Sequence, residues 1–219
     1  MASNSKARKS SSKESPDLQE LLVLELQEIH SAEKQLSRII PRLVKAAENE
    51  TLQAAIEERL AEGEQIIEDV ETALEALESS PGRKKNVAAE GLVNDMREHV
   101  QELQAGPALD TVLIGALQKT EHYCIAAWGT VKALGSAAGQ RDLVGAMDRA
   151  LEEGRAYDER LTELAESEIT PALTAGAGEE AEPEEAAEGE ESEEEMEASS
   201  GRTPPRRQQG GRNTGQRAR

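Results

Sequence analysis

Apolar residues recur at steps of three and four along most of the chain, which is the spacing that places them on one face of an α-helix. Short polar or Gly- and Pro-containing breaks divide this pattern and predict four long amphipathic helices, over residues 17–47, 50–79, 108–134 and 140–168. A shorter amphipathic segment at 87–104 predicts an extra helix between the second and third long helices. Because such helices bury their apolar faces against one another, the pattern predicts an all-α fold, a four-helix bundle with one extra short helix.

Capping signals place some of the helix ends. Asp17 is followed three residues later by Glu20, which is the arrangement of a capping box at a helix N-terminus. Gly135 is expected to close the third long helix, and Pro171 stands shortly after the fourth. The folded domain is therefore predicted to span residues 17–170.

The two ends of the chain differ in composition from this domain. Residues 1–16 are rich in Ser and Lys, and residues 171–219 hold an acidic stretch followed by a stretch rich in Arg, Gly and Pro. Segments of this kind bury too little apolar surface to fold, so both tails are predicted to be disordered. Solubility or tethering is their simplest role, and contact with unknown partners is the alternative.

Charge and composition exclude several classes of function. The net charge is −19, with twelve Glu residues in 179–197 and six Arg residues in 201–219, so the part before residue 179 is itself strongly acidic. Such a bundle surface repels nucleic acid. A single Cys excludes an internal disulfide and a multi-Cys metal site, and the chain has no Phe. With no apolar run of about 20 residues and no secretory signal, a cytoplasmic protein without membrane contact is expected.

Acidic residues occur where an apolar stripe should continue. Five lie at or beside the stripes near mid-helix, and they come from all four long helices: Glu33, Glu62, Glu121, Glu153 and Asp158. A buried carboxylate costs several kcal/mol unless it is neutralised, paired or bound to metal. Inward carboxylates from four helices are the arrangement that holds two iron or manganese ions, so these five residues are the predicted metal ligands.

Other interpretations of the same residues stay open. Arg59 borders the stripe of the second helix and could pair with Glu33 or Glu121 in place of a metal ion. Glu62, Glu153 and Asp158 could instead be solvated helix flanks. The stretch TEHYCIAAW at 120–128 gathers rare side chains, of which Cys124 and Trp128 are interpreted as core residues.

Four segments resemble the YciE/YciF family of ferritin-like stress proteins: LQEIHSAEKQL, GLVND, LIGALQKTEHYCIAAWGTVKALG and RALEEGRAYDERLTELA. The resemblance covers about residues 17–168. It implies a ferritin-like helical bundle, often a homodimer, with a candidate dinuclear metal site, while the reaction of the family is poorly defined. Acids of the family motifs match these positions of the chain: Glu33, Glu62, Asp95, Glu121, Glu152, Glu153 and Asp158.

Two departures from the family motifs bear on the metal site. Arg59 stands where the family motif H-x-x-E-T has His, and Cys124 stands where E-H-Y-E has its second Glu. Arg cannot bind a metal ion and carries a permanent positive charge. The leading hypothesis is a stress-response protein that binds iron or manganese and handles iron or reactive oxygen species. The alternative is a metal-free structural or interaction protein in which Arg59 pairs with the carboxylates.

Overall fold

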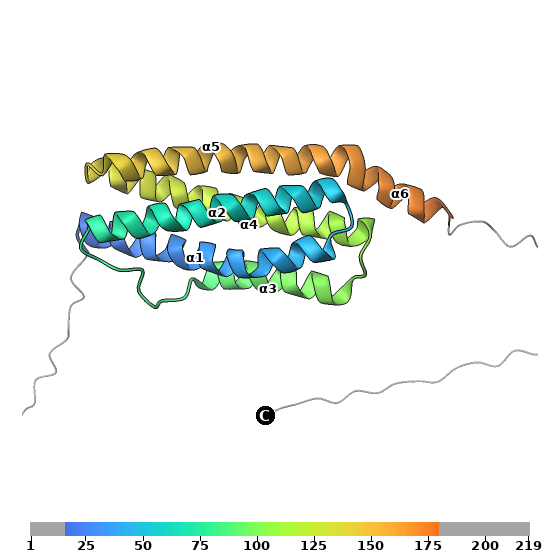
Figure 1. Cartoon of the computed structure of the whole chain (residues 1–219), viewed down its shortest axis with the longest axis horizontal. Helices are drawn as coiled ribbons and strands as arrows, with labels where there is room; N and C mark the ends of the chain where they lie inside the picture. The colour runs from blue at the N-terminus through green and yellow to red at the C-terminus, as the bar shows by residue number, and fades with distance from the viewer. Residues whose placement is uncertain (1–15, 180–219) are drawn as a thin grey trace, which may run out of the picture. The chain divides into compact units, whose positions relative to one another are not determined.

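The long helices of the described residues lie side by side and form a bundle (Figure 1). The computed structural model describes the backbone of residues 16–179 and side chains up to residue 175. The elements in this range are α1 (Leu18–Ala46), α2 (Glu50–Ala76), α3 (Val87–Glu102), α4 (Pro107–Ala137), α5 (Arg141–Leu164), a π-helical turn η1 (Ala165–Ile169) and α6 (Thr170–Glu179). Helices α1, α2, α4 and α5 pack as a bundle, and the short α3 packs against α1 and α4. The predicted all-α bundle with an extra short helix is confirmed.

The start of the bundle follows the sequence signal. Asp17 accepts a hydrogen bond from the Glu20 N–H over 2.8 Å, and Glu20 accepts one from the Asp17 N–H over 3.0 Å, so the predicted capping box is present. Asn49 and Asn86 cap α2 and α3, each accepting one backbone N–H through its side-chain oxygen. The predicted tails lie outside the described residues, apart from Pro16 and residues 171–179.

The prediction that Gly135 closes α4 is wrong, because the helix continues to Ala137. Gly139, with a φ of +72°, makes the left-handed turn that ends it. The Gln140 N–H donates to the Gly135 carbonyl and the Gly139 N–H donates to the Ser136 carbonyl, as in a Schellman motif. Gly135 lies within the helix, and a Cβ there would lie 3.3 Å from a Leu143 methyl group, so its small size serves the packing of α5.

The last helix extends past the predicted boundary at residue 170. After Leu164 the chain makes the single π-helical turn η1 and continues as α6 to Glu179. The π-turn shifts the hydrogen-bond register by one residue. Pro171 then occupies the first turn of α6, where proline is tolerated.

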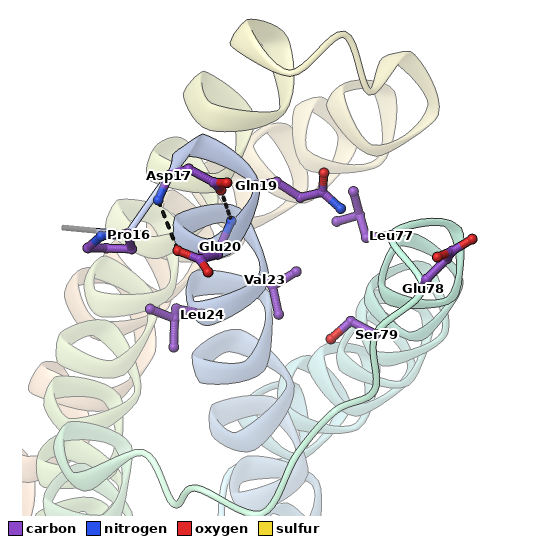
Figure 2. Close-up of a pocket in the computed structure, with 9 residues that line it drawn as sticks. All are labelled: Pro16, Asp17, Gln19, Glu20, Val23, Leu24, Leu77, Glu78 and Ser79. Atoms are coloured by element: carbon purple, nitrogen blue, oxygen red, sulfur yellow. Dashed lines mark hydrogen bonds between the residues drawn. The ribbon is translucent and has the colours of Figure 1, made fainter. Parts of the chain in front are cut away.

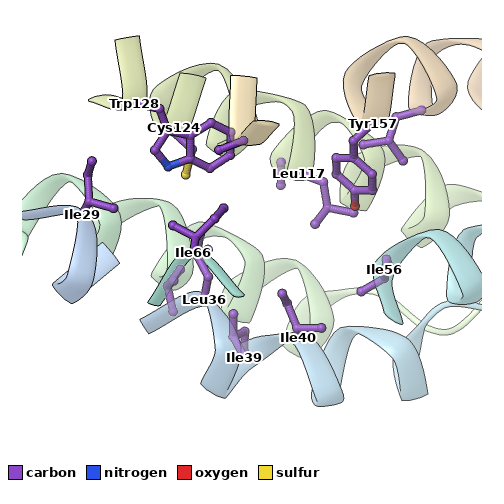
Figure 3. Close-up of a cluster of buried hydrophobic side chains, with 14 of the residues drawn as sticks. Ile29, Leu36, Ile39, Ile40, Ile56, Ile66, Leu117, Cys124, Trp128 and Tyr157 are labelled. Carbon is purple, nitrogen blue, oxygen red and sulfur yellow. The ribbon is translucent and has the colours of Figure 1, made fainter. Parts of the chain in front are cut away.

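Aliphatic side chains from all of the long helices fill the interior (Figure 3). Trp128 and Tyr157 are each 1% exposed, and Cys124 is also 1% exposed, so the interpretation of Cys124 and Trp128 as core residues is confirmed. Among the described residues, no helix has the length and apolar character needed to cross a membrane.

Two buried polar residues hold the connections in place. Asp110 of α4, 2% exposed, accepts hydrogen bonds from the N–H groups of Glu48 and Asn49 between α1 and α2. Asn86, also 2% exposed, donates to the Tyr123 hydroxyl of α4 and to the Glu28 carbonyl of α1. Both residues tie a loop to helices distant in sequence, and so they help fix the order of the bundle.

Candidate functional site

A buried set of charged side chains joins three of the long helices. Glu33 of α1, Arg59 of α2 and Glu121 of α4 are 1%, 3% and 2% exposed. Arg59 Nε donates to Glu121 Oε2 over 2.7 Å, and Arg59 Nη2 donates to both oxygens of Glu33 at 3.2 Å. The same Nη2 lies 3.8 Å from Cys124 Sγ. These four residues are called the Arg59 centre below.

The helical period brings these side chains together. Glu33 interrupts the buried stripe between Ile29 and Leu36, and Glu121 follows Leu117 by four residues, so both carboxylates must point inward. Arg59, predicted at the border of its stripe, is fully part of it. Its long side chain carries the guanidinium to both acids at once.

Burial and the neighbouring charges act against each other at Arg59. Burial alone would lower the pKa of Arg59, but the charges of Glu33 and Glu121 outweigh it and raise the pKa well above its usual value. The guanidinium is therefore a permanent cation inside the bundle. Removing two charges from water is costly, and the cost is offset here by close, charge-assisted hydrogen bonds.

One guanidinium faces two buried carboxylates, so negative charge is in excess. Burial raises the pKa of Glu121, against the opposing effect of Arg59, and this moves Glu121 toward its neutral form. Burial and the charge of Glu33 likewise raise the pKa of Cys124 well above the usual value of a thiol. Cys124 is therefore a neutral thiol beside the guanidinium and behaves as a small core residue.

Two glycines make room for the Arg59 centre. A Cβ on Gly63 of α2 would lie 2.9 Å from Arg59 Nη1 and 3.1 Å from Glu33 Oε2. A Cβ on Gly154 of α5 would lie 2.6 Å from Glu121 Oε1. Each glycine costs its helix about 1 kcal/mol relative to Ala. The space they leave is taken by the guanidinium and the carboxylates, which accounts for both.

Trp128 forms one wall of the centre. The Arg59 guanidinium carbon lies 5.6 Å from the centroid of its ring, within the range of a cation–π contact. A Cβ on Gly154 would also lie 2.6 Å from Trp128 Cζ3, so Gly154 admits the ring as well as the carboxylate. Of the rare side chains of the 120–128 stretch, Cys124 and Trp128 therefore enclose the buried cation, whereas His122 is exposed and Tyr123 bonds Asn86.

The remaining predicted ligands lie further out. Glu62 is half-buried, Glu153 is exposed, and Asp158 is half-buried. Burial is the main cause that raises the pKa of Glu62 to about 7, with the charges of Glu121 and Glu153 adding to it and Arg59 opposing it. Of the five predicted ligands, only Glu33 and Glu121 therefore bond Arg59.

The other family-matched polar residues form surface pairs. Asp158 accepts a hydrogen bond from Gln118 Nε2 over 3.2 Å and lies 3.5 Å from Nε2 of the exposed His122. Asp95 on α3 lies 3.6 Å from His99 Nε2 and 3.5 Å from Lys119 Nζ. Neither acid reaches Arg59. Asp110, which sequence reasoning did not single out, is the other deeply buried acid among the described residues.

A pair of metal ions and the present residues make a poor fit. The guanidinium of Arg59 uses both oxygens of Glu33 and one of Glu121, and metal ions would need these oxygens as ligands. Within residues 16–175, no three His, Cys, Asp or Glu side chains are placed so that they could hold a metal ion. Glu121 Oε1 is the one oxygen of the two buried acids that has no partner within this range.

A separate open groove lies at one end of the bundle (Figure 2). Its volume is about 610 Å³, and it runs between the start of α1 and the end of α2. Val23, Leu24 and Leu77 line it together with the acids Asp17 and Glu78. It shares no residue with the Arg59 centre, and no buried charged group opens into it.

The comparisons with known proteins agree on one family. A family model described as a domain of unknown function, DUF892, matches residues 17–174. The protein YciF of Escherichia coli is 35% identical over 149 residues, which is 68% of this chain and 90% of YciF.

Solved structures give the same result. The crystal structure of the E. coli stress protein YciF matches with a TM-score of 0.67 at 33% identity, over 71% of this chain and 99% of that one. YcfI of Rhodopseudomonas palustris, whose description proposes a structural protein, matches with a TM-score of 0.64 at 27% identity, over 69% and 96% of the two chains. The match of the family model over residues 17–174 and the similarity to YciF show that the chain belongs to the DUF892 family.

Proposed function

We propose that this protein is a metal-independent member of its family, a structural or interaction protein of the stress response in which Arg59 serves as the internal cation. The observation that carries the proposal is the position of the guanidinium between Glu33 and Glu121, bonded to both. It supplies the positive charge that converging carboxylates require, and it does so without a ligand that can dissociate. The stress-response role is carried over from YciF.

Such a protein would bind its partners at its surface, because the Arg59 centre is closed to solvent. Arg59, Glu33 and Glu121 are all almost fully buried, and the cavity beside them measures only about 10 Å³. A substrate of ordinary size has no place there. A soluble cytoplasmic homodimer, with tails that contact partners, is the assembly proposed for it.

Iron or manganese binding is the second candidate, and one feature favours it. Glu121 Oε1 has no partner among the described residues, and the charges of Glu33 and Asp158 help to raise the pKa of Glu121. Hard carboxylate oxygens are suitable ligands for Fe(II) or Mn(II). Glu33, Glu62, Glu121, Glu153 and Asp158 would hold the ions, which would supply redox chemistry when bound. This site requires Arg59 to leave its present partners.

Elemental analysis and thermal melts test the two candidates. The full chain, purified without chelator, is analysed for Fe and Mn, and its Tm is measured with and without added Fe(II) or Mn(II). The proposal expects less than about 0.1 metal ion per chain and an unchanged Tm, since a ligand that binds only the folded state would raise Tm. Close to one or two ions per chain, or a Tm that rises with metal concentration, would establish the metal-binding candidate.

A further inference from the structure

An apolar ridge stays exposed at the start of α1. Six large apolar side chains are exposed among the described residues, and three of them, Leu18, Leu21 and Leu24, lie in the first two turns of this helix. Their spacing of three residues makes them neighbours on the helix surface. Leu24, which is 44% exposed, also lines the groove between the start of α1 and the end of α2. Clustered apolar side chains on a polar surface indicate a contact site.

The groove beside this ridge has apolar walls and an acidic rim. Figure 2 shows Val23 on α1 and Leu77 at the end of α2 on its two sides. Its charged lining residues are Asp17, Glu20 and Glu78, and no Lys, Arg or His of the described residues lines it. A ligand that fits this surface must therefore carry apolar side chains for the walls and positive charge for the rim.

Glu78 on this rim has a backbone conformation that glutamate rarely adopts. Its φ is +53°, and it makes the left-handed turn that ends α2. The Ser79 N–H donates to the Leu74 carbonyl over 2.8 Å, and the Glu78 N–H donates to the Glu75 carbonyl over 2.9 Å, as in a Schellman motif. Glycine adopts this conformation without strain, so a glutamate here costs stability. Backbone strain of this kind is often found at functional sites, which agrees with a role of the acid in binding.

We propose that the ridge and the groove together dock a basic amphipathic helix of a partner protein, with its apolar side chains against Leu24 and Val23 and its Lys or Arg side chains against the acidic rim. An amphipathic helix commonly binds a groove in this way. A second copy of the chain fits less well, because a two-fold contact would bring the acidic rims of two chains of net charge −19 together. The inference rests on the proposed function, since a metal-independent interaction protein acts through such a surface.

Model peptides test the partner chemistry on the full chain in EDTA. The probe is a fluorescein-labelled peptide of about 18 residues, composed of Leu and Lys with Leu at steps of three and four, and its binding is measured by fluorescence anisotropy. One control peptide has Glu in place of Lys, and the other has the same residues in an order that gives no apolar face. We expect the probe to bind at least about tenfold more tightly than either control. Equal binding of the three peptides would overturn the proposal.

Leu24→Gln locates the contact. Its matched control is Leu103→Gln at the end of α3, because Leu103 is 38% exposed and does not line the groove. We expect Leu24→Gln to weaken binding of the probe at least about fivefold and Leu103→Gln to leave it unchanged. Glu78→Gly should raise the Tm by relieving the strain and yet weaken binding, which a purely structural role of Glu78 would not do. Glu57→Gln, which removes an exposed acid in the first half of α2, should change neither quantity.

Equal affinity of the wild type, Leu24→Gln and Glu78→Gly for the probe overturns the inference, because the peptide would then bind elsewhere on the acidic chain. A lower mass of Leu24→Gln in sedimentation equilibrium, with unchanged binding of the probe, also overturns it, since a second copy would then occupy the surface. Because metal is absent from these samples, either failure is distinguishable from failure of the proposed function, which is detected by metal analysis of untreated protein.

Discussion

Arg59 Nε and Glu121 Oε2 lie 2.7 Å apart, and both side chains are almost fully buried between α2 and α4. The other arm of the same guanidinium reaches Glu33 on α1. One planar group therefore fixes the relative position of three helices, and the fork geometry makes the contact directional as well as strong. Loss of the guanidinium would leave two carboxylates without compensation in the interior.

Arg59→Met is expected to lower the free energy of unfolding by about 3–5 kcal/mol, because it leaves buried acids unpaired. Urea denaturation followed by circular dichroism measures the loss. The control is Arg149→Met, which removes a surface pair between the exposed Arg149 and Asp69 and should cost less than about 1 kcal/mol. Equal losses in the two variants would mean that the buried contact contributes no more than a surface pair.

Helical periodicity was enough to predict much of this arrangement. The stripes gave the helices, and Glu33 and Glu121 were identified as inward because each replaces an apolar residue in a regular line. The sequence also indicates a pairing of Arg59 with Glu33 or Glu121 as an alternative to metal, and in the structure Arg59 bonds both. Periodicity could not decide whether a guanidinium or a metal ion neutralises these two carboxylates, because either cation would offset the same negative charge.

The features that sequence reasoning missed depend on contacts between distant residues. Asp110 resembles an ordinary acid in the first turn of a helix, a position that the helix dipole favours. Its actual partners are the N–H groups of Glu48 and Asn49, about 60 residues away, and no local pattern indicates them. Gly135 has the composition signal of a helix end because glycine is common there, whereas in the structure its small size serves packing against Leu143.

Gly154→Ala is expected to destabilise the protein although alanine is the better helix former. The new Cβ would lie 2.6 Å from both Glu121 Oε1 and Trp128 Cζ3, and overpacking of this kind costs about 1–3 kcal/mol. Gly145→Ala on the same helix is the matched control, because nothing lies within 4 Å of its Cβ. That control should gain up to about 1 kcal/mol. Thermal melts measure the Tm of both variants, and we expect a lower Tm for Gly154→Ala and an equal or higher Tm for Gly145→Ala. A Gly154→Ala variant with a raised Tm would refute the close packing.

Glu62 is expected to make stability depend on pH near neutrality. Burial raises its pKa from 4.5 to about 7 in the folded protein, so folding favours the protonated form. The stabilising effect is complete below about pH 4.5 and is lost as pH rises through 7.

Glu62→Gln removes this dependence by fixing the neutral form. We expect the variant to come close to the wild type in urea midpoint at pH 4, below the unfolded pKa, and to exceed it at pH 8. Glu64→Gln, on the exposed face of the same helix, controls for the loss of a negative charge. If Glu62→Gln and Glu64→Gln change the midpoint equally at pH 8, burial of Glu62 is not the cause.

Restoring the family residues should convert the centre into a metal site. In Arg59→His/Cys124→Glu, the permanent cation is replaced by an imidazole, and a further carboxylate is added beside Glu33 and Glu121. The buried negative charge then has no internal partner, so we expect the double variant to be less stable than the wild type without metal. Fe(II) or Mn(II) should raise its Tm, because metal binding only to the folded state shifts unfolding by mass action.

Arg59→His alone is the control for loss of the guanidinium, and titration with Mn(II) followed by elemental analysis gives the stoichiometry. A double variant that takes up no metal would show that the remaining acids, Glu62, Glu153 and Asp158, lie too far from the centre to complete a coordination sphere. In that case the fold of this chain, and not Arg59 alone, excludes the ions.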